Sequence, residues 1–395
     1  MKHSYPSYNR PPALRQLYKY LWIFFLLLFL ITLIIPTMIV FSTGSGSLAM
    51  NKSLTSSISQ KSSAVTEDNK ISSVSVNKHV SPKESPLSIG WVTGNNNNSS
   101  TQDLSAYHNL KVVSPALVSI NNQYNLQVNS NPSLINTMHT QDKKIWARFI
   151  INNDTKSNVH TFLSNPSKTQ EIIKKIYQVS LNNQWDGINL DIENVRSQDR
   201  DLFSQFVKSL SNLLNQSKIV LSIDLPPDSK GSNNKYGPFD HKIIGNYCDY
   251  IIFMGYDQHW STDPVPGPVT SLSWLKENVQ EFTKTGIPPQ KMILGLPAYT
   301  RVWQQDNSGK IVKKPATSVQ YVEDLVTQNH RNLNWNSTLG EYYTSYTANN
   351  RVYQVWLPTV TSFKEYLDLI PQYHLAGSAI WSLDLMSASY WNQIF

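Results

Sequence analysis

Two carboxylates, two residues apart, have the residue types and spacing that acid–base chemistry requires. Asp191 and Glu193 lie in the segment 186–193 (DGINLDIE), in which apolar and polar residues alternate after Asp186. In a β-strand, residues two apart share a face and are about 6.6 Å apart along the strand, so both acids would project from one side. In such a pair, one carboxyl group could donate a proton while the other supplies a negative charge beside it. On a solvent-facing edge strand it would simply contact water.

The neighbouring segments indicate where this strand lies. Segments with helical periodicity precede and follow 186–193, and a strand between two helices belongs to a parallel sheet whose outer face is covered by helices. Its apolar side chains, those of Ile188, Leu190 and Ile192, would pack against those helices. The polar face would then line the inside of a closed barrel. Both acids are near the C-terminal end of the strand, where barrel enzymes place their active sites.

The rest of the chain can supply the other strands and helices of such a barrel. Residues 203–214 carry apolar side chains at helical spacing and predict a core-facing helix after the acidic strand. The eight predicted strands are 87–92, 111–118, 144–150, 186–193, 218–224, 250–256, 291–296 and 377–381. Strands that alternate with helices in this way predict an α/β fold, a (β/α)8 TIM barrel.

The connection between the seventh and eighth predicted strands is about eighty residues long, too long for one helix and its loops. Within it, residues 342–346 and 349–356 predict a β-hairpin, and helices are expected near 319–328 and 362–370. We therefore expect a small α+β elaboration that forms one wall of the cleft.

The N-terminal part of the chain has a different character. Residues 1–20 form a basic tail, and the uncharged apolar run within 21–43 is long enough to span a membrane as a signal anchor. The positive-inside bias places the tail in the cytoplasm. Residues 44–85 are polar and almost free of aromatic residues, which predicts a disordered linker. The domain 86–395 would then be extracytoplasmic on a single-pass membrane anchor. The alternative is a long signal peptide cleaved near 47–49.

The net charge of +7 is concentrated in these N-terminal segments. Residues 1–50 contribute +4 and residues 51–85 contribute +2, which leaves +1 for residues 86–395. A nearly neutral folded part gives no support to nucleic-acid binding. The nine His residues form no HExxH motif or Cys/His cluster, so we expect no metal and no cofactor. The single cysteine, Cys248, excludes an internal disulfide and is expected to be buried.

The acidic segment also resembles the DxxDxDxE signature of glycoside hydrolase family 18, the chitinase-like family. Asp186, Asp191 and Glu193 match the signature, and Asn189 stands where the family usually has a second inner Asp.

Three further motifs follow in the order of that family. Residues 249–257 (DYIIFMGYD) resemble its sixth-strand MxYD motif, and 291–297 (KMILGLP) resemble its seventh strand. Residues 377–381 (GSAIW) resemble its eighth strand, which ends in a substrate-stacking Trp. The resemblance covers roughly residue 87 to the C-terminus. It is closest to the bacterial branch that includes spore cortex and cell-wall N-acetylglucosaminidases.

The resemblance implies a role for each matching residue. In family 18, the 2-acetamido oxygen of the sugar attacks the anomeric carbon, so the enzyme supplies an acid and an orienting charge. Glu193 would be the general acid and then the general base, Asp191 would hold the acetamido N–H, and Tyr256 would donate to the acetamido carbonyl. The expected substrate-binding residues are Asn189, Met254, Asp257 and Trp381. Asp186 would be structural.

Asn189 is the departure from the family pattern. An Asp at this place can share a proton with its neighbour, whereas Asn can hydrogen-bond Asp191 but cannot take up a proton. The substitution could shift the pH profile or abolish activity. Family relatives that act as lectins usually lose the acid Glu, whereas this chain retains it at Glu193.

The sequence therefore predicts a membrane-anchored, extracytoplasmic glycoside hydrolase that cleaves β-1,4 bonds next to N-acetylglucosamine. Its expected partner is a polysaccharide that contains N-acetylglucosamine, either peptidoglycan or a chitin-type glycan, and we expect it to act as a monomer. The alternative is a non-catalytic, lectin-like protein that uses the same cleft. A weaker reading is a structural wall-spacing anchor. Peptidoglycan or chitin as substrate, and exo or endo cleavage, stay open.

Overall fold

The computed structural model describes residues 85–93, 103–227 and 237–395. The predicted basic tail and membrane anchor lie outside these residues, and so does the predicted linker except for Ser85. Across the described ranges, no helix combines the length and the apolar character that crossing a membrane requires.

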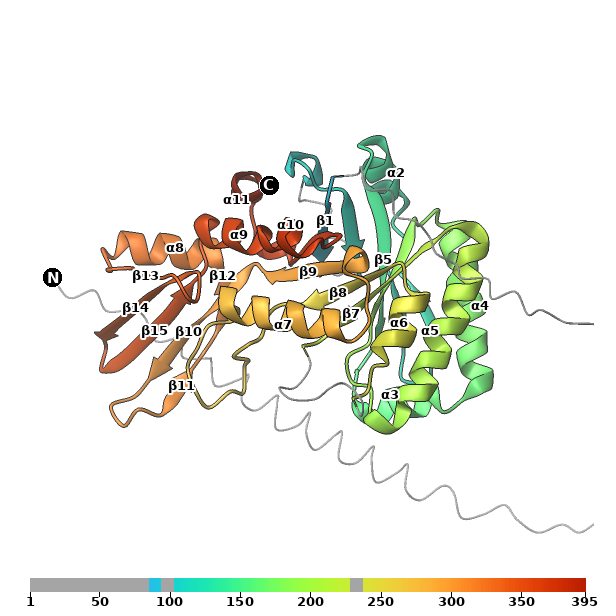
Figure 1. Cartoon of the computed structure of the whole chain (residues 1–395), viewed down its shortest axis with the longest axis horizontal. Helices are drawn as coiled ribbons and strands as arrows, with labels where there is room; N and C mark the ends of the chain where they lie inside the picture. The colour runs from blue at the N-terminus through green and yellow to red at the C-terminus, as the bar shows by residue number, and fades with distance from the viewer. Residues whose placement is uncertain (1–84, 94–102, 228–236) are drawn as a thin grey trace, which may run out of the picture. The chain divides into compact units, whose positions relative to one another are not determined.

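Within the described residues, eight parallel strands close into a barrel (Figure 1). The circle closes because β1 pairs with both β2 and β16, and β2 also pairs with β5. In order around the barrel, the strands are β1 (Leu87–Val92), β2 (Val112–Pro115), β5 (Lys144–Ile151), β6 (Gly187–Asp191), β7 (Val220–Leu225), β8 (Tyr250–Met254), β9 (Met292–Pro297) and β16 (Gly377–Trp381). This architecture confirms the predicted TIM barrel.

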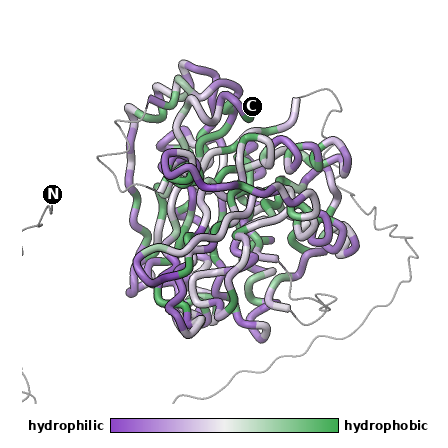
Figure 2. The backbone as a smooth tube through the Cα atoms, turned by 90° about the vertical axis from the view of Figure 1, so that its left-hand side faces the viewer, coloured by the Kyte–Doolittle hydropathy of each residue, from purple (hydrophilic) through white to green (hydrophobic). Residues whose placement is uncertain are grey.

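Helices cover the outside of the barrel. They are α2 (Pro132–Thr140), α3 (Lys156–Leu163), α4 (Pro166–Asn182), α5 (Arg200–Leu214), α6 (His241–Tyr247), α7 (Leu272–Lys284), α9 (Val360–Leu367), α10 (Leu369–Tyr373) and α11 (Ala388–Ile394). The apolar stripe predicted after the acidic strand is the buried face of α5. Hydrophilic stretches lie mostly at the periphery, around apolar strands (Figure 2). Cys248 is buried, as expected.

The prediction of one continuous second strand was wrong. β2 ends at Pro115, which has no backbone N–H for a ladder, and Leu117 donates its N–H to the Pro115 carbonyl in a tight turn. The chain then resumes as β3 (Val118–Ile120), which pairs with the C-terminal half of β5. A further strand, β4 (Leu126–Val128), pairs antiparallel with β3.

The long connection between β9 and β16 folds as the predicted α+β elaboration, with its own antiparallel sheet beside the barrel (Figure 1). Its hairpin turns at Asn349 and Asn350, both at positive φ, which Asn tolerates well. Its elements are β10 (Tyr299–Gln305), β11 (Ile311–Lys313), β12 (Ala316–Ser318), α8 (Val319–Gln328), β13 (Asn334–Asn336), β14 (Glu341–Ala348) and β15 (Arg351–Leu357). The strands β10 to β13 were not predicted.

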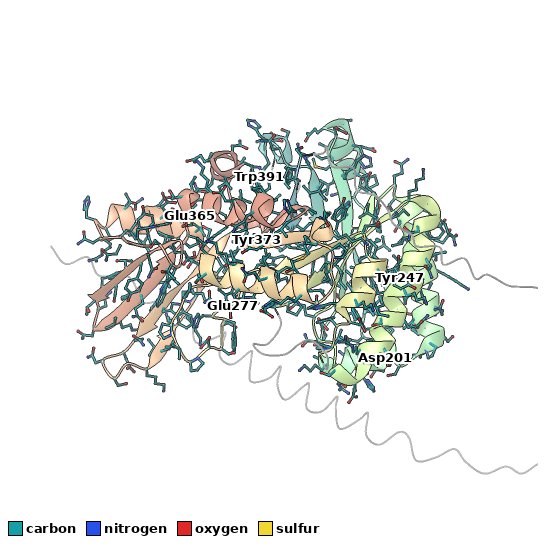
Figure 3. All side chains as sticks on the ribbon, in the orientation of Figure 1. Asp201, Tyr247, Glu277, Glu365, Tyr373 and Trp391 are labelled. Carbon is teal, nitrogen blue, oxygen red and sulfur yellow. The ribbon has the colours of Figure 1, made fainter. Side chains whose placement is uncertain are left out.

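Two cores hold these layers together. The larger core lies between the strands and the helices and includes Ile188, Leu190 and Ile192, as their alternation predicted. A smaller one fills the barrel, with Trp91 and Trp146 among its members. The C-terminal helix is tied to the first part of the barrel. Trp391 (labelled in Figure 3) donates its indole N–H to the carbonyl of His108 at 2.7 Å.

The seam between β1 and β16 leaves no room for a side chain at Gly377. A Cβ there would overlap the backbone oxygen of Leu87 and lie 2.6 Å from its nitrogen. We expect Gly377→Ala to lower the free energy of unfolding by about 2–3 kcal/mol, because backbone cannot move aside without opening the barrel. Urea unfolding would measure this. Gly245→Ala on α6 is the control, because a Cβ there would meet Ile287 and Pro288 only at ordinary contact distance, and it is expected to be neutral or stabilising. Equal stability of the two variants would contradict the prediction.

Candidate active site

A pocket of about 330 Å³ lies at the C-terminal ends of the barrel strands. Every residue predicted to be catalytic contributes to its wall, together with side chains from later loops and from the elaboration. Its lining residues are Asp191, Glu193, Asp224, Pro226, Pro227, Met254, Tyr256, Asp257, Trp260, Tyr299 and Trp381.

The acidic strand is shorter than predicted. β6 ends at Asp191, and Glu193 follows in the loop that leads to α5. Ile192, only 1% exposed, anchors the chain between the two acids. Asp154, in the loop after β5, holds this segment with two hydrogen bonds. Its carboxylate accepts from the Glu193 backbone N–H at 3.4 Å, and its backbone carbonyl accepts from the Asn194 side-chain amide at 3.0 Å. The two acids therefore reach the same pocket from a strand end and an adjoining loop.

Asp191 forms an ion pair with an arginine of the neighbouring strand. Arg148 on β5 places Nη1 3.0 Å from Asp191 Oδ2, and both side chains are largely buried. The guanidinium also lies 4.7 Å from the ring centre of Trp381, within the range of a cation–π contact. Burial raises the pKa of Asp191, and the charge and hydrogen bond of Arg148 oppose that shift.

Glu193 is exposed to the cleft, while other protein groups lie close around it. Its pKa is raised to about 7, first by burial and then by the negative charges of Asp191, Asp154 and Asp257, while Arg148 acts in the opposite direction. A carboxyl with this pKa is protonated for a large fraction of the time at neutral pH. It can therefore donate a proton in one step and accept one in the next.

The loop after β8 supplies the polar groups on the other side of the pocket. Met254 ends the strand, and burial raises the pKa of Tyr256 so that its hydroxyl remains a neutral donor. Asp257 accepts hydrogen bonds from the Tyr299 hydroxyl at 2.7 Å and from Arg301 at 3.2 Å. Tyr299 and Arg301 belong to β10, so the elaboration contributes directly to the pocket wall.

Aromatic rings border the pocket at its floor and its rim. Trp381, the last residue of β16, packs edge-on against Trp91 with ring centres 5.6 Å apart. Trp260 also lines the pocket, with 49% of its surface exposed, and its indole N–H donates to the Thr262 hydroxyl. Such an arrangement offers flat apolar surfaces to a ring-shaped ligand.

Asn189 lies beneath the pocket and not in its wall. Its side chain is fully buried, and all four of its hydrogen-bonding positions are used by protein groups. Trp91 Nε1 and Ser114 Oγ donate to its oxygen, and its nitrogen donates to Ser222 Oγ and to Asp224 Oδ1. The geometry therefore does not offer Asn189 as the direct substrate contact that was expected, because no face of it reaches the pocket.

Asp186 lies at the opposite end of β6. Its Oδ2 contacts His139 Nε2 and accepts from the Ile145 backbone N–H, both at 2.8 Å. Lys144 lies 3.5 Å from its other oxygen. These contacts join β6 to α2 and β5, which suits the structural role that the sequence suggested.

A sequence model described as glycosyl hydrolases family 18 matches residues 88–385. This chain belongs to that family. The match spans the barrel from its first strand to its last together with the elaboration, and Asp191 and Glu193 lie within it.

Curated relatives agree with this assignment. An uncharacterized glycosylase of Bacillus subtilis, YvbX, is 26% identical over 329 residues, which cover 79% of this chain and 91% of the relative. The cortical fragment-lytic enzyme of Bacillus subtilis is 24% identical over 232 residues, 58% of this chain and 53% of that protein. This chain therefore spans about half the length of the second relative.

Solved structures show the same fold. The spore cortex-lytic enzyme SleL of Bacillus megaterium superposes with a TM-score of 0.68 at 19% identity, covering 80% of this chain and 74% of that one. A chitinase from Chromobacterium violaceum gives a TM-score of 0.68 at 18% identity, covering 78% of this chain and 98% of that one.

Three residues at the site of this family 18 domain were not found from the sequence: Asp224 and Tyr299, which line the pocket, and Arg148, which pairs with Asp191. Arg148 falls at an inward position of a predicted strand. Because a cation inside a barrel needs an acidic partner, this position could have indicated a contact with one of the acids. Asp224 likewise follows the inward alternation of β7. Tyr299 had no comparable signal, because β10 was not predicted. Among the described residues, no group of three or more His, Cys, Asp or Glu side chains is arranged to hold a metal ion.

Proposed function

We propose that this glycoside hydrolase cleaves β-1,4 bonds next to N-acetylglucosamine in peptidoglycan or chitin-type glycans, by substrate-assisted catalysis with retention. The observation that carries the proposal is the convergence of Glu193, Asp191 and Tyr256 on one pocket beside Trp381. A single proton donor beside an orienting carboxylate suits a reaction in which the sugar supplies its own nucleophile.

In the first step, Glu193 donates its proton to the glycosidic oxygen, and the leaving sugar departs as the acetamido oxygen attacks the anomeric carbon. Asp191 holds the acetamido N–H and stabilises the positive charge that develops on the resulting oxazolinium ion. Tyr256 donates its hydroxyl to the acetamido oxygen and orients it. In the second step, Glu193 takes a proton from water, which opens the intermediate from the same face.

The remaining pocket residues hold the sugar. Trp381 forms an apolar floor beneath the ring, and Met254 packs beside it. Asp257, which already accepts hydrogen bonds from Tyr299 and Arg301, accepts a further hydrogen bond from a hydroxyl of the same sugar. Because its carboxylate is fixed by two donors, it can select the orientation of the bound residue.

The proposed site of action is the outer face of a membrane. The motivation is the apolar run within residues 21–43 and the polar segment that follows it. A domain on such a tether can reach a wall polymer, and a relative whose name describes lysis of cortical fragments supports peptidoglycan. Retention of the full-length chain in washed membranes, with release of a variant that lacks residues 1–43, would test the anchor. A full-length chain found only in the soluble fraction would contradict it.

The pKa of Glu193 predicts how activity depends on pH. The acid must be protonated to act, so kcat/KM should fall about tenfold per pH unit above pH 7. Asp154→Asn removes a negative charge that raises this pKa, so the alkaline limb should move to lower pH. Asp201→Asn on α5 (Asp201 is labelled in Figure 3) is the matched control, because Asp201 neither lines the pocket nor is among the groups that shift the pKa of Glu193. An alkaline limb at the same pH in both variants would exclude Glu193 as the titrating group.

The proposed activity can be tested on the purified protein with N-acetylglucosamine oligomers and with isolated peptidoglycan. Products are followed by mass spectrometry, and the first-formed anomer by NMR. Fragments that end in N-acetylglucosamine, released first as the β-anomer, are expected. Saturable binding with no product over a broad pH range would contradict the proposal and favour the lectin-like alternative. The α-anomer as first product would contradict the retaining mechanism.

A further inference from the structure

Two carboxyl groups of the pocket lining, those of Asp191 and Asp224, lie near one buried cation, Arg148. Asp191 ends β6, and Asp224 lies near the end of the neighbouring strand β7 with only 2% of its surface exposed. Within the described residues, the ion pair of this cluster joins Arg148 to Asp191, and no cation forms one with Asp224. Two adjacent buried carboxylates that share one cation are strongly disfavoured when both are ionised.

The orientation of the Asn189 amide is fixed by its neighbours. Trp91 Nε1 is a pure donor, so the atom that faces it at 2.9 Å must be the amide oxygen. The amide nitrogen then faces β7 and donates to Asp224 Oδ1 at 2.8 Å. Asp224 therefore uses Oδ1 as an acceptor. Its second oxygen belongs to a side chain that lines the pocket and can carry a proton there.

We propose that Asp224 is a positioning residue that works as a neutral carboxylic acid, the protonated partner of Asp191. Because Asp224 carries a proton, Asp191 is the charged carboxylate of this pair when positive charge develops on the sugar. Asp224 thus supplies the protonated carboxyl that Asn189 cannot supply. The inference rests on the proposed function, because its role is defined by that reaction.

The electrostatics of the pocket agree with this assignment. Burial and the charge of Asp191 raise the pKa of Asp224 well above its ordinary value, and the Asn189 hydrogen bond and Arg148 oppose the shift. The groups that face Asp224 are Asp191 on β6, Arg148 on β5, Tyr256 after β8 and Glu193.

Three variants separate the neutral form from the ionised form. Asp224→Asn keeps an acceptor for Asn189 and a donor toward the pocket, so it imitates the protonated acid. Asp224→Leu keeps the approximate size but loses both. We expect Asp224→Leu to reduce kcat about tenfold or more relative to Asp224→Asn. The alkaline limb of kcat/KM should stay at the same pH in Asp224→Asn, because no charge is lost. Asp257→Asn is the control. It removes a negative charge that raises the pKa of Glu193, so its limb should move to lower pH.

Infrared spectroscopy gives a readout that does not depend on turnover. At neutral pH, the infrared difference spectrum between the full-length chain, purified in detergent, and its Asp224→Asn variant should show the C=O stretch of a protonated carboxylic acid that the variant has lost. Glu193 and the buried Glu341, whose pKa values are also raised, contribute to both spectra and cancel in the difference. That band together with an unmoved limb would support the proposal. A difference spectrum without that band, or a limb that moves to lower pH in Asp224→Asn, would overturn it. If the wild-type chain cleaves no glycan, the proposed function fails, and the infrared band alone still decides the protonation of Asp224.

Discussion

Replacing Glu193 with glutamine is expected to lower kcat by about 10³-fold or more while substrate binding persists. The amide has nearly the same shape but can neither give a proton to the leaving oxygen nor take one from water. Because its pKa is held near 7 by burial and by neighbouring carboxylates, Glu193 is the pocket group suited to both transfers. Product formation by mass spectrometry and affinity by calorimetry would measure the two effects separately.

Glu171→Gln is a suitable control for this variant. Glu171 lies on α4, exposed to solvent, where it pairs with Lys168 and Lys175. The change should leave turnover as it is in the wild type. If Glu193→Gln turned over substrate at the wild-type rate, Glu193 could not be the general acid, and the mechanism proposed for this pocket would have to be abandoned.

Asp191→Asn is expected to have the second large effect, in two separate measurements. Turnover should fall about 10²–10³-fold, because the negative charge that we propose stabilises the oxazolinium ion is lost. The free energy of unfolding should also fall, by up to about 3 kcal/mol, because Arg148 is left in a buried position with a neutral partner. Steady-state kinetics and urea unfolding would measure these changes.

A double variant separates the two consequences. In Asp191→Asn/Arg148→Met, the buried cation is removed together with its partner, and the methionine side chain can fill the space beside Trp381. Stability should return toward that of the wild type, whereas turnover should stay low. Recovery of turnover in the double variant would show that Asp191 serves only to neutralise Arg148.

The ion pair between Arg148 and Asp191 lies beside position 189, where this chain has Asn189 instead of the second inner aspartate that the family pattern usually has. The two neighbouring strands bring side chains to Asp191 instead, Arg148 from β5 as an ion pair and Asp224 from β7. The ionisable groups around Asp191 therefore come from three strands, whereas the family signature places its acids on one strand.

The sequence by itself determined the barrel and the side of the strand on which the acids lie. Residues in a strand alternate faces with a period of two, so the apolar set Ile188, Leu190 and Ile192 decided that Asn189 and Asp191 point inward. The order of strands and helices then indicated the closed parallel sheet. Both inferences need only local periodicity, which is present in the chain itself.

The tertiary structure alone decided which inward side chains meet. The alternation of side chains along each strand predicts that Arg148 and Asp224 face the interior of the barrel. It does not predict which residues of neighbouring strands lie level with them, because the register between strands is set by how the whole barrel closes. Arg148 is level with Asn189, and its long side chain reaches up to Asp191. Asn189 is level with Ser222, which places Asp224 next to its amide nitrogen. Tyr299 itself pairs with Ser318 of β12, and the middle of its strand pairs with β15, so no pattern local to Tyr299 could reveal its place at the pocket.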